Sequence, residues 1–99
     1  MGKYRKKPVI IEAFRWTGDK DQVEDPEWIV EAIKEGTVSF DRFARLNRTE
    51  ERLKMLIETL EGQMIAMPGD WIIRGNKGEI YPCKPEIFEA TYERIETDE

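Results

Sequence analysis

The residue with the clearest capacity for chemistry is Cys83, the single cysteine of this 99-residue chain. A cysteine becomes nucleophilic when its thiol pKa is lowered, and both the adjacent Lys84 and a helix start directly after it favour a thiolate. The chain contains no histidine that would serve as the general base. A cysteine at a strand end is usually a small packed hydrophobe. We therefore expect Cys83 to be packed and the protein not to be an enzyme.

Carboxylates are the other candidates for catalysis or metal binding. Without histidine, and with one cysteine, a metal site would have to use oxygen ligands and a hard ion such as magnesium. The candidate acidic ligands are Glu12, Asp70 and Glu79, but their spacing resembles no known metal-binding loop. We expect neither a metal nor a cofactor.

Aromatic and basic residues gather between positions 71 and 84, a combination that suits nucleic-acid or nucleotide binding. Rings stack on bases and cations contact phosphates, provided that the rings are exposed. The glycine-rich segment 75–78 lacks the Walker pattern, so we interpret it as a hairpin turn and not as a phosphate cradle. The candidate binding residues are Trp71, Arg74, Lys77, Tyr81 and Lys84, supplemented by Tyr4 and a basic arm at about residues 1–7.

The composition is that of a single solvated globular domain spanning residues 1–99. Apolar residues make up 39% of the chain and charged residues 37%, which argues against disorder throughout. A net charge of −5 disfavours non-specific nucleic-acid binding but leaves room for local basic patches. The basic arm contrasts with an acidic tail at about residues 94–99. No apolar run reaches the roughly 20 residues of a membrane helix and no targeting segment is visible, so we expect a cytosolic protein.

The elements that would position these residues begin with a strand at 9–16, rich in β-branched and aromatic residues. Apolar side chains occur on both of its faces, so we expect the strand to be covered on both sides. Glu12 would then be partly buried and need a partner. An ion pair, or a bulge that turns Glu12 outward, is more common for such a residue than catalysis.

An amphipathic helix is predicted at about residues 26–35. Asp25-Pro26-Glu27 supplies a capping aspartate, a proline for the first helical position and an acid for the first turn. Apolar residues follow at helical spacing and place Trp28 in the core, and Gly36 suits the helix end. Trp16 and Trp71 are expected in the core as well, because large aromatic residues are generally buried.

Residues 37–52 fit a strand or a short helix, and we favour a strand followed by a turn at 47–51. Four arginines recur here at helical spacing and would make a phosphate-binding stripe. Acidic residues lie among them, which favours a salt-bridged, solvated face instead. The arginines are Arg42, Arg45, Arg48 and Arg52.

The second half of the chain predicts a series of antiparallel strands. Residues 53–60 and 63–67 form a hairpin that reverses at Glu61-Gly62. The turn at 68–70 leads to a strand at 71–74, and the turn at 75–78 leads to a strand at 79–83. Pro82 cannot donate to a neighbouring strand, so this last strand is either an edge strand or ends at that point. A short helix at about 85–92 follows, whose Phe88 and Tyr92 dock on the sheet.

Several segments together resemble a family of short proteins encoded by bacteriophages and prophages. They are Lys-Tyr-Arg-Lys-Lys-Pro-Val-Ile-Ile-Glu-Ala at 3–13, Thr-Leu-Glu-Gly at 59–62, Gly-Asp-Trp-Ile-Ile-Arg-Gly at 69–75, and Tyr-Pro-Cys-Lys-Pro-Glu-Ile-Phe at 81–88. The resemblance covers about half of the residues. It implies a phage or prophage origin and a cytoplasmic setting in a bacterial host, and it assigns no functional residue.

The sequence thus predicts an α+β fold, a mostly antiparallel β-meander of five to six strands with one amphipathic helix and a short C-terminal helix. We expect a non-enzymatic binding module that engages a host or phage protein through a sheet edge or an exposed aromatic patch. Nucleic-acid or nucleotide binding is the alternative. A homo-oligomer would form through an edge strand, and no membrane contact is expected.

Overall fold

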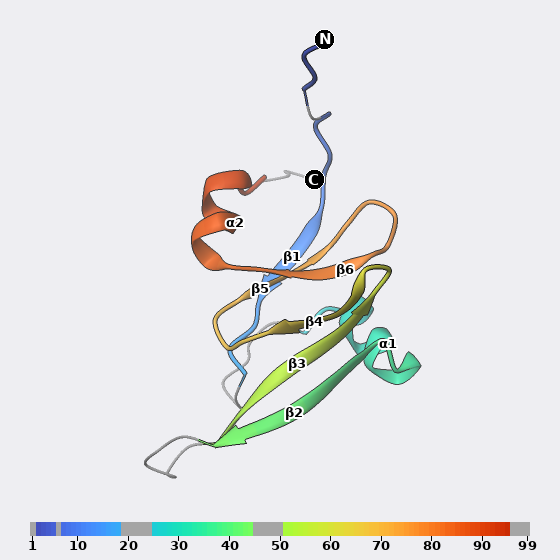
Figure 1. Cartoon of the computed structure of the whole chain (residues 1–99), viewed down its shortest axis with the longest axis vertical. Coiled ribbons are helices and arrows are strands. Elements are labelled where there is room, and N and C mark those ends of the chain that lie inside the picture. Colours follow the sequence, from blue (N-terminus) through green and yellow to red (C-terminus); the bar gives the residue numbers. More distant parts are fainter. Residues whose placement is uncertain (1, 6, 19–24, 45–50, 96–99) are drawn as a thin grey trace.

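The computed structural model describes residues 2–5, 7–18, 25–44 and 51–95 (Figure 1). Within them the chain forms six strands and two helices, and the strands make two antiparallel three-stranded sheets, ordered β1-β5-β6 and β2-β3-β4. The predicted α+β class is therefore confirmed, although the strands are divided between two sheets. In chain order the elements are β1 (Glu12–Arg15), α1 (Glu27–Glu35), β2 (Val38–Ala44), β3 (Glu51–Thr59), β4 (Gly62–Ala66), β5 (Trp71–Arg74), β6 (Ile80–Cys83) and α2 (Pro85–Thr91).

The turn at 67–70 carries the chain from one sheet to the other. Pro68 and Gly69 occupy its central positions, Gly69 has a φ of 97°, and the Asp70 N–H donates to the Met67 carbonyl oxygen at 3.0 Å. Proline followed by a glycine with positive φ is the pattern of a type II turn. After it, β5 pairs with β1 and β6 and not with β4, so the meander is interrupted at this turn.

Both sheets and α1 contribute to one hydrophobic core. Alternate residues of β3 point into it, and Met55 and Ile57 are buried, as the period of two predicts. Phe14 of β1 lies opposite Ile72 of β5, and both side chains are buried. The remaining buried members are Trp16, Ile29, Ala32, Val38 and Ala66.

Helix α1 forms where the sequence predicts it, but its start differs in detail. Pro26 is the residue before the helix and no side chain caps the first turn, so the predicted cap by Asp25 is not formed. Gly36 ends the helix in the left-handed conformation, with a φ of 88°, as predicted. Trp28 is only partly buried, packing edge-on against Phe14 with ring centroids 5.6 Å apart.

The first strand is shorter than predicted, because its partner β5 has only four residues, which pair with Glu12–Arg15. Val9 and Ile10 precede the paired region and are exposed, so the predicted cover on both faces is wrong for this part. Glu12 is also exposed, so it is not partly buried as a strand covered on both faces would require. Its predicted ion pair is present, with Arg74 at 3.0 Å.

The predicted strand in residues 37–52 is confirmed by β2, which pairs with β3. The predicted turn at 47–51 lies largely outside the described residues. The side chains of the four arginines between positions 42 and 52 are also outside the described part of the structure. The β3–β4 hairpin is confirmed, and its last pair is Thr59 with Gly62, which leaves Leu60 and Glu61 at the tip.

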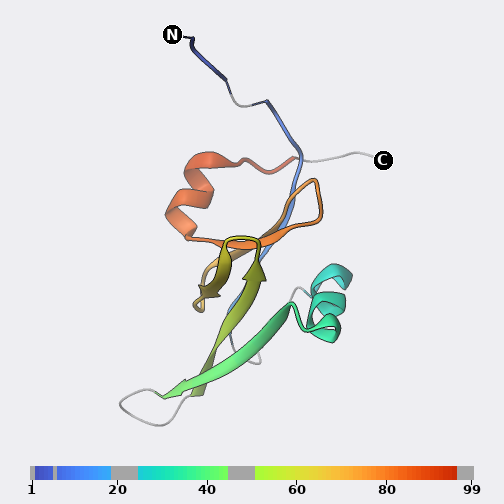
Figure 2. The same cartoon turned by 45° about the vertical axis from the view of Figure 1, so that its right-hand side comes forward.

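Helix α2 covers the second face of the β1-β5-β6 sheet (Figures 1 and 2). It begins at Pro85, and Phe88 of its first turn stacks on Trp71, so the predicted docking of this helix on the sheet is confirmed. Strand β6 is an edge strand, the first of the two alternatives that Pro82 predicts. No helix in the described ranges is long and apolar enough to span a bilayer.

Candidate functional site

The described part of the chain contains an open groove of about 810 Å³. Helix α1, the β3–β4 hairpin tip and the β5–β6 hairpin border it, and these elements lie together on one side of the molecule in Figure 1. We call it the α1 groove. Its lining consists of Trp28, Glu31, Ala32, Glu35, Thr37, Glu58, Thr59, Leu60, Glu61, Met64, Arg74, Gly78, Glu79, Ile80 and Tyr81.

Apolar side chains from all three bordering elements line the α1 groove. Trp28 comes from α1 and Ile80 from β6, and both are partly buried against the core. At the tip of the β3–β4 hairpin, Leu60 is fully exposed, and Met64 of β4 is 39% exposed. A large exposed leucine at a hairpin tip contributes nothing to the core, and neighbouring apolar side chains in a concave surface typically mark a binding site.

The charged residues of the α1 groove are almost all acidic. Five glutamates belong to the lining and all five are exposed. Arg74 is the only cation among the lining residues that the structure describes, and its guanidinium pairs with Glu12. The groove therefore combines an apolar surface with an excess of negative charge. The five glutamates are Glu31, Glu35, Glu58, Glu61 and Glu79.

Trp71, one of the predicted binding residues, does not have the exposed ring that stacking on a nucleic-acid base requires. Trp71 lies flat on Phe88, with ring centroids 4.0 Å apart and planes 5° apart. One face of its indole is therefore covered by α2 and unavailable to a base. Its indole N–H is buried and has no hydrogen-bond partner among the described residues.

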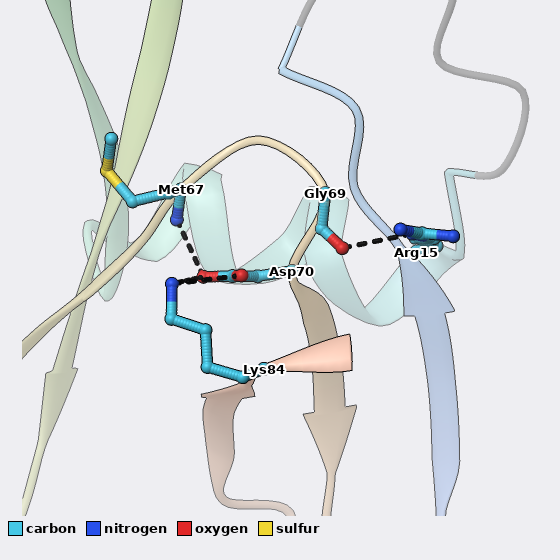
Figure 3. A network of polar contacts seen from close by, with 5 residues as sticks. All are labelled: Arg15, Met67, Gly69, Asp70 and Lys84. Atoms are coloured by element: carbon cyan, nitrogen blue, oxygen red, sulfur yellow. Dashed lines mark hydrogen bonds and ion pairs between the residues drawn. The ribbon is translucent and has the colours of Figure 1, made fainter. Parts of the chain in front are cut away.

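Two of the three predicted cations are held in ion pairs. Lys84 donates to both carboxylate oxygens of Asp70, at 3.2 and 3.1 Å (Figure 3). Asp70 is 4% exposed and also accepts a hydrogen bond from the Met67 N–H at 2.9 Å. The Asp70 carboxylate thereby joins the turn after β4 to the start of α2. It also pairs with the Lys84 ammonium, which a bound phosphate would need as its own partner.

Arg74 and Lys77 complete the predicted cations. The guanidinium of Arg74 donates to the Glu12 carboxylate at 3.0 Å. Lys77 is exposed in the β5–β6 turn, where its backbone N–H donates to the Glu79 carboxylate at 3.1 Å. An acidic group therefore contacts each of these two residues.

Tyr81 is partly buried, and its hydroxyl lies 3.4 Å from the Tyr92 hydroxyl. Burial, assisted by the hydrogen bond and the charge of nearby groups, raises the pKa of Tyr81 well above its ordinary value. Tyr81 is the one predicted binding aromatic that also lines the α1 groove.

The environment of Cys83 is opposite to that of a reactive thiol. Burial, and secondarily the charge of Asp70, raise the pKa of Cys83. The adjacent Lys84 does not counteract this, because its ammonium pairs with Asp70. The adjacent lysine and the following helix start, which favour a thiolate in the sequence, therefore do not lower the pKa of Cys83 in the structure.

The carboxylates considered for metal binding lie in separate contacts. Glu12 pairs with Arg74, Asp70 with Lys84, and Glu79 accepts from the Lys77 backbone. Across the described segments, no three aspartate, glutamate, cysteine or histidine side chains gather in a way that would hold a metal ion.

The acidic lining of the α1 groove was not identified from the sequence. Glu31 and Glu35 lie one helical turn apart on α1 and Glu58 and Glu61 flank the hairpin tip, which are separate and unremarkable patterns of solvated charge. The available signal was Leu60, an apolar residue between glutamates next to a turn. Comparison with known proteins adds no further guide, because no family model, curated protein or solved structure matches the chain.

Proposed function

We propose that the protein is a small non-enzymatic binding module that engages a partner protein through the α1 groove. The observation that carries this proposal is that exposed apolar side chains and five glutamates line the same concave surface. The partner segment that fits is a short stretch of apolar residues interspersed with lysine or arginine.

The apolar side chains and the glutamates of the α1 groove contribute to binding in different ways. Burying Leu60, Met64 and the edge of Trp28 supplies the affinity, at roughly 25 cal/mol per Å² of apolar surface removed from water. The glutamates attract a cationic segment and reject an acidic one, which contributes to selectivity and association rate more than to affinity. Binding should therefore weaken with salt but not disappear.

A titration with designed peptides tests the proposal. The first peptide has nine residues, with lysines interspersed among isoleucine, tyrosine and proline. In two matched controls, glutamate replaces every lysine or serine replaces every apolar residue. We expect only the first peptide to bind, detected by calorimetry, and equal weak binding of all three would contradict the proposal.

Substitutions locate the binding surface. Leu60→Ser combined with Glu61→Lys changes both features of the α1 groove, and we expect affinity for the first peptide to fall at least about tenfold. Ile87→Ser combined with Glu89→Lys makes the same chemical change on α2, at exposed positions outside the groove lining. The α2 pair should leave affinity unchanged.

The resemblance to phage and prophage proteins implies that the partner is a host or phage protein. The proposal therefore includes a phage or prophage origin of the protein and a cytoplasmic setting.

Nucleic-acid or nucleotide binding through Arg74, Lys77, Tyr81 and Lys84 is the second candidate function. Its main support is the basic arm, where Lys3, Arg5 and Lys7 are exposed. A fluorescence titration with single-stranded oligonucleotides at low salt, where phosphate contacts are strongest, would remove it if no binding occurred.

A further inference from the structure

We infer that the segment occupying the α1 groove is the N-terminal segment of a second copy of this chain, residues 2–10, which contains most of the basic arm and is called the arm below. The inference rests on the proposed use of the groove as a binding site and names its occupant. It predicts a dimer in which two arms are exchanged, a closed two-fold arrangement of the kind common among homo-oligomers.

The arm has the chemistry that the groove requires. Lys3, Arg5 and Lys7 are all exposed, and Tyr4 and Ile10 are 96% and 75% exposed. In an extended conformation, odd and even positions point to opposite sides. Lys3, Arg5 and Lys7 would then share one side, while Tyr4 and Ile10 lie at positions of the other side, which also includes Lys6. Such a segment offers apolar rings and chains to the lining of the groove and a high density of cations to its glutamates.

Length and direction favour the groove of another copy over the arm's own. Lys7, Val9 and Ile11 lie along a depression of about 320 Å³ that Asn76 and Tyr92 also line. From there the arm leads away from both sheets, as Figures 1 and 2 both show. Nine extended residues reach roughly 30 Å, which is long enough to enter a neighbouring molecule.

The arm explains exposed apolar surface on both sides of the contact. Tyr4 and Ile10 are too far along an unpaired segment to join the core, and Leu60 is fully exposed at its hairpin tip. Bringing these side chains together removes all three from water. Each arm carries four cations and would bring them to a groove lined by five glutamates, so charge complementarity favours this occupant.

Sedimentation velocity of the full chain, over a wide concentration range and at low and high salt, provides the first measurement. We expect the mass to rise from that of the 11.7 kDa monomer to twice this value with concentration, and the dimer to weaken with salt. A monomer at every concentration would overturn the inference. An arm that binds the groove of its own chain would also give this result.

A charge exchange between two variants identifies the contact. One variant carries Lys3→Glu, Arg5→Glu and Lys7→Glu in the arm, and the other carries Glu31→Lys, Glu35→Lys and Glu61→Lys in the groove, which leaves lysines in excess over the two remaining glutamates of the lining. All six positions are exposed, so both variants should fold, which circular dichroism checks. Each variant alone should self-associate at least about tenfold more weakly than the native chain, because arm and groove then have the same charge.

Mixing the two variants restores opposite charges at both contacts and should restore a dimer containing one copy of each. If the mixture stays monomeric, or if the single variants dimerise like the native chain, the arm does not occupy the groove. Binding of the designed lysine peptide without restoration in the mixture would overturn this inference and leave the proposed function intact. Failure of both would overturn both.

Discussion

The indole of Trp71 and the ring of Phe88 lie parallel, 4.0 Å apart, and this stacking attaches α2 to the β1-β5-β6 sheet. No residue of α2 is fully buried, so the attachment relies on few contacts. Tyr92 extends it, because its ring lies 5.1 Å from that of Phe88 and its hydroxyl meets Tyr81.

Replacing Phe88 with alanine should therefore loosen α2. We expect a loss of about 1 to 3 kcal/mol in the free energy of unfolding, below the range for a fully buried phenylalanine because Phe88 is only partly buried. Urea unfolding measures the loss, and red-shifted tryptophan emission should accompany it as Trp71 becomes hydrated. Ile87→Ala is the control, since Ile87 is 58% exposed and should change stability by no more than about 0.5 kcal/mol.

Asp70 connects two parts of the chain through different atoms, which allows its roles to be separated. Asp70→Ala removes both the Lys84 ion pair and the acceptor for the Met67 N–H, and should cost about 2 to 3 kcal/mol of unfolding free energy. Asp70→Asn keeps an oxygen acceptor for the turn and should cost about 1 kcal/mol. Denaturant unfolding of both variants tests the order, and equal losses would show that the turn hydrogen bond contributes nothing.

The thiol of Cys83 should react slowly at neutral pH, since burial and the charge of Asp70 raise its pKa. Removing the charge with Asp70→Asn should lower the pKa of Cys83 and shift the pH profile of iodoacetamide alkylation to lower pH. Glu89→Gln, a charge removal on the exposed side of α2, is the control and should leave the profile in place. An unchanged profile in Asp70→Asn would mean that burial alone raises the pKa.

Alkaline pH should destabilise the protein through Tyr81. Its pKa is raised in the folded state, so the neutral phenol is favoured there and the stabilisation is complete below the ordinary tyrosine pKa of about 10. Stability is lost as pH rises from that value through the folded pKa. Tyr81→Phe should remove the part of this loss that sets in above about pH 10, which urea unfolding at several pH values on both sides of that point measures. Tyr4→Phe is the control, because Tyr4 is almost fully exposed and should leave the pH dependence unchanged.

Local features of the fold were predictable because neighbouring residues determine them. Strand β5 has the predicted bounds, Trp71–Arg74, since turns with proline or glycine delimit it on both sides. Helix α1 and its end at Gly36 follow from helical spacing and from a residue that accepts positive φ. Pro82 indicated an edge strand or a strand end because proline lacks the N–H that a second neighbour would require.

What could not be predicted depends on contacts between distant residues. Glu12 and Arg74 are 62 positions apart, and only their pairing shows that the paired part of β1 begins at Glu12 and leaves Val9 and Ile10 outside the sheet. The α1 groove likewise joins glutamates from a helix and two hairpins. Cys83 was expected to be packed, but the sequence could not show that Asp70 rather than the sulfur receives the ammonium of Lys84.

Mapping the designed lysine peptide onto the protein by ¹⁵N NMR tests the central claim most directly, because it identifies the surface as well as the affinity. A full-length variant with Lys3→Gln, Arg5→Gln and Lys7→Gln keeps arms of other copies from competing. We predict that the largest amide shifts occur around Trp28, Leu60 and Ile80, where the three borders of the α1 groove meet. Shifts confined to α2 or to the arm, or no shifts at saturating peptide, would contradict a binding function for this groove.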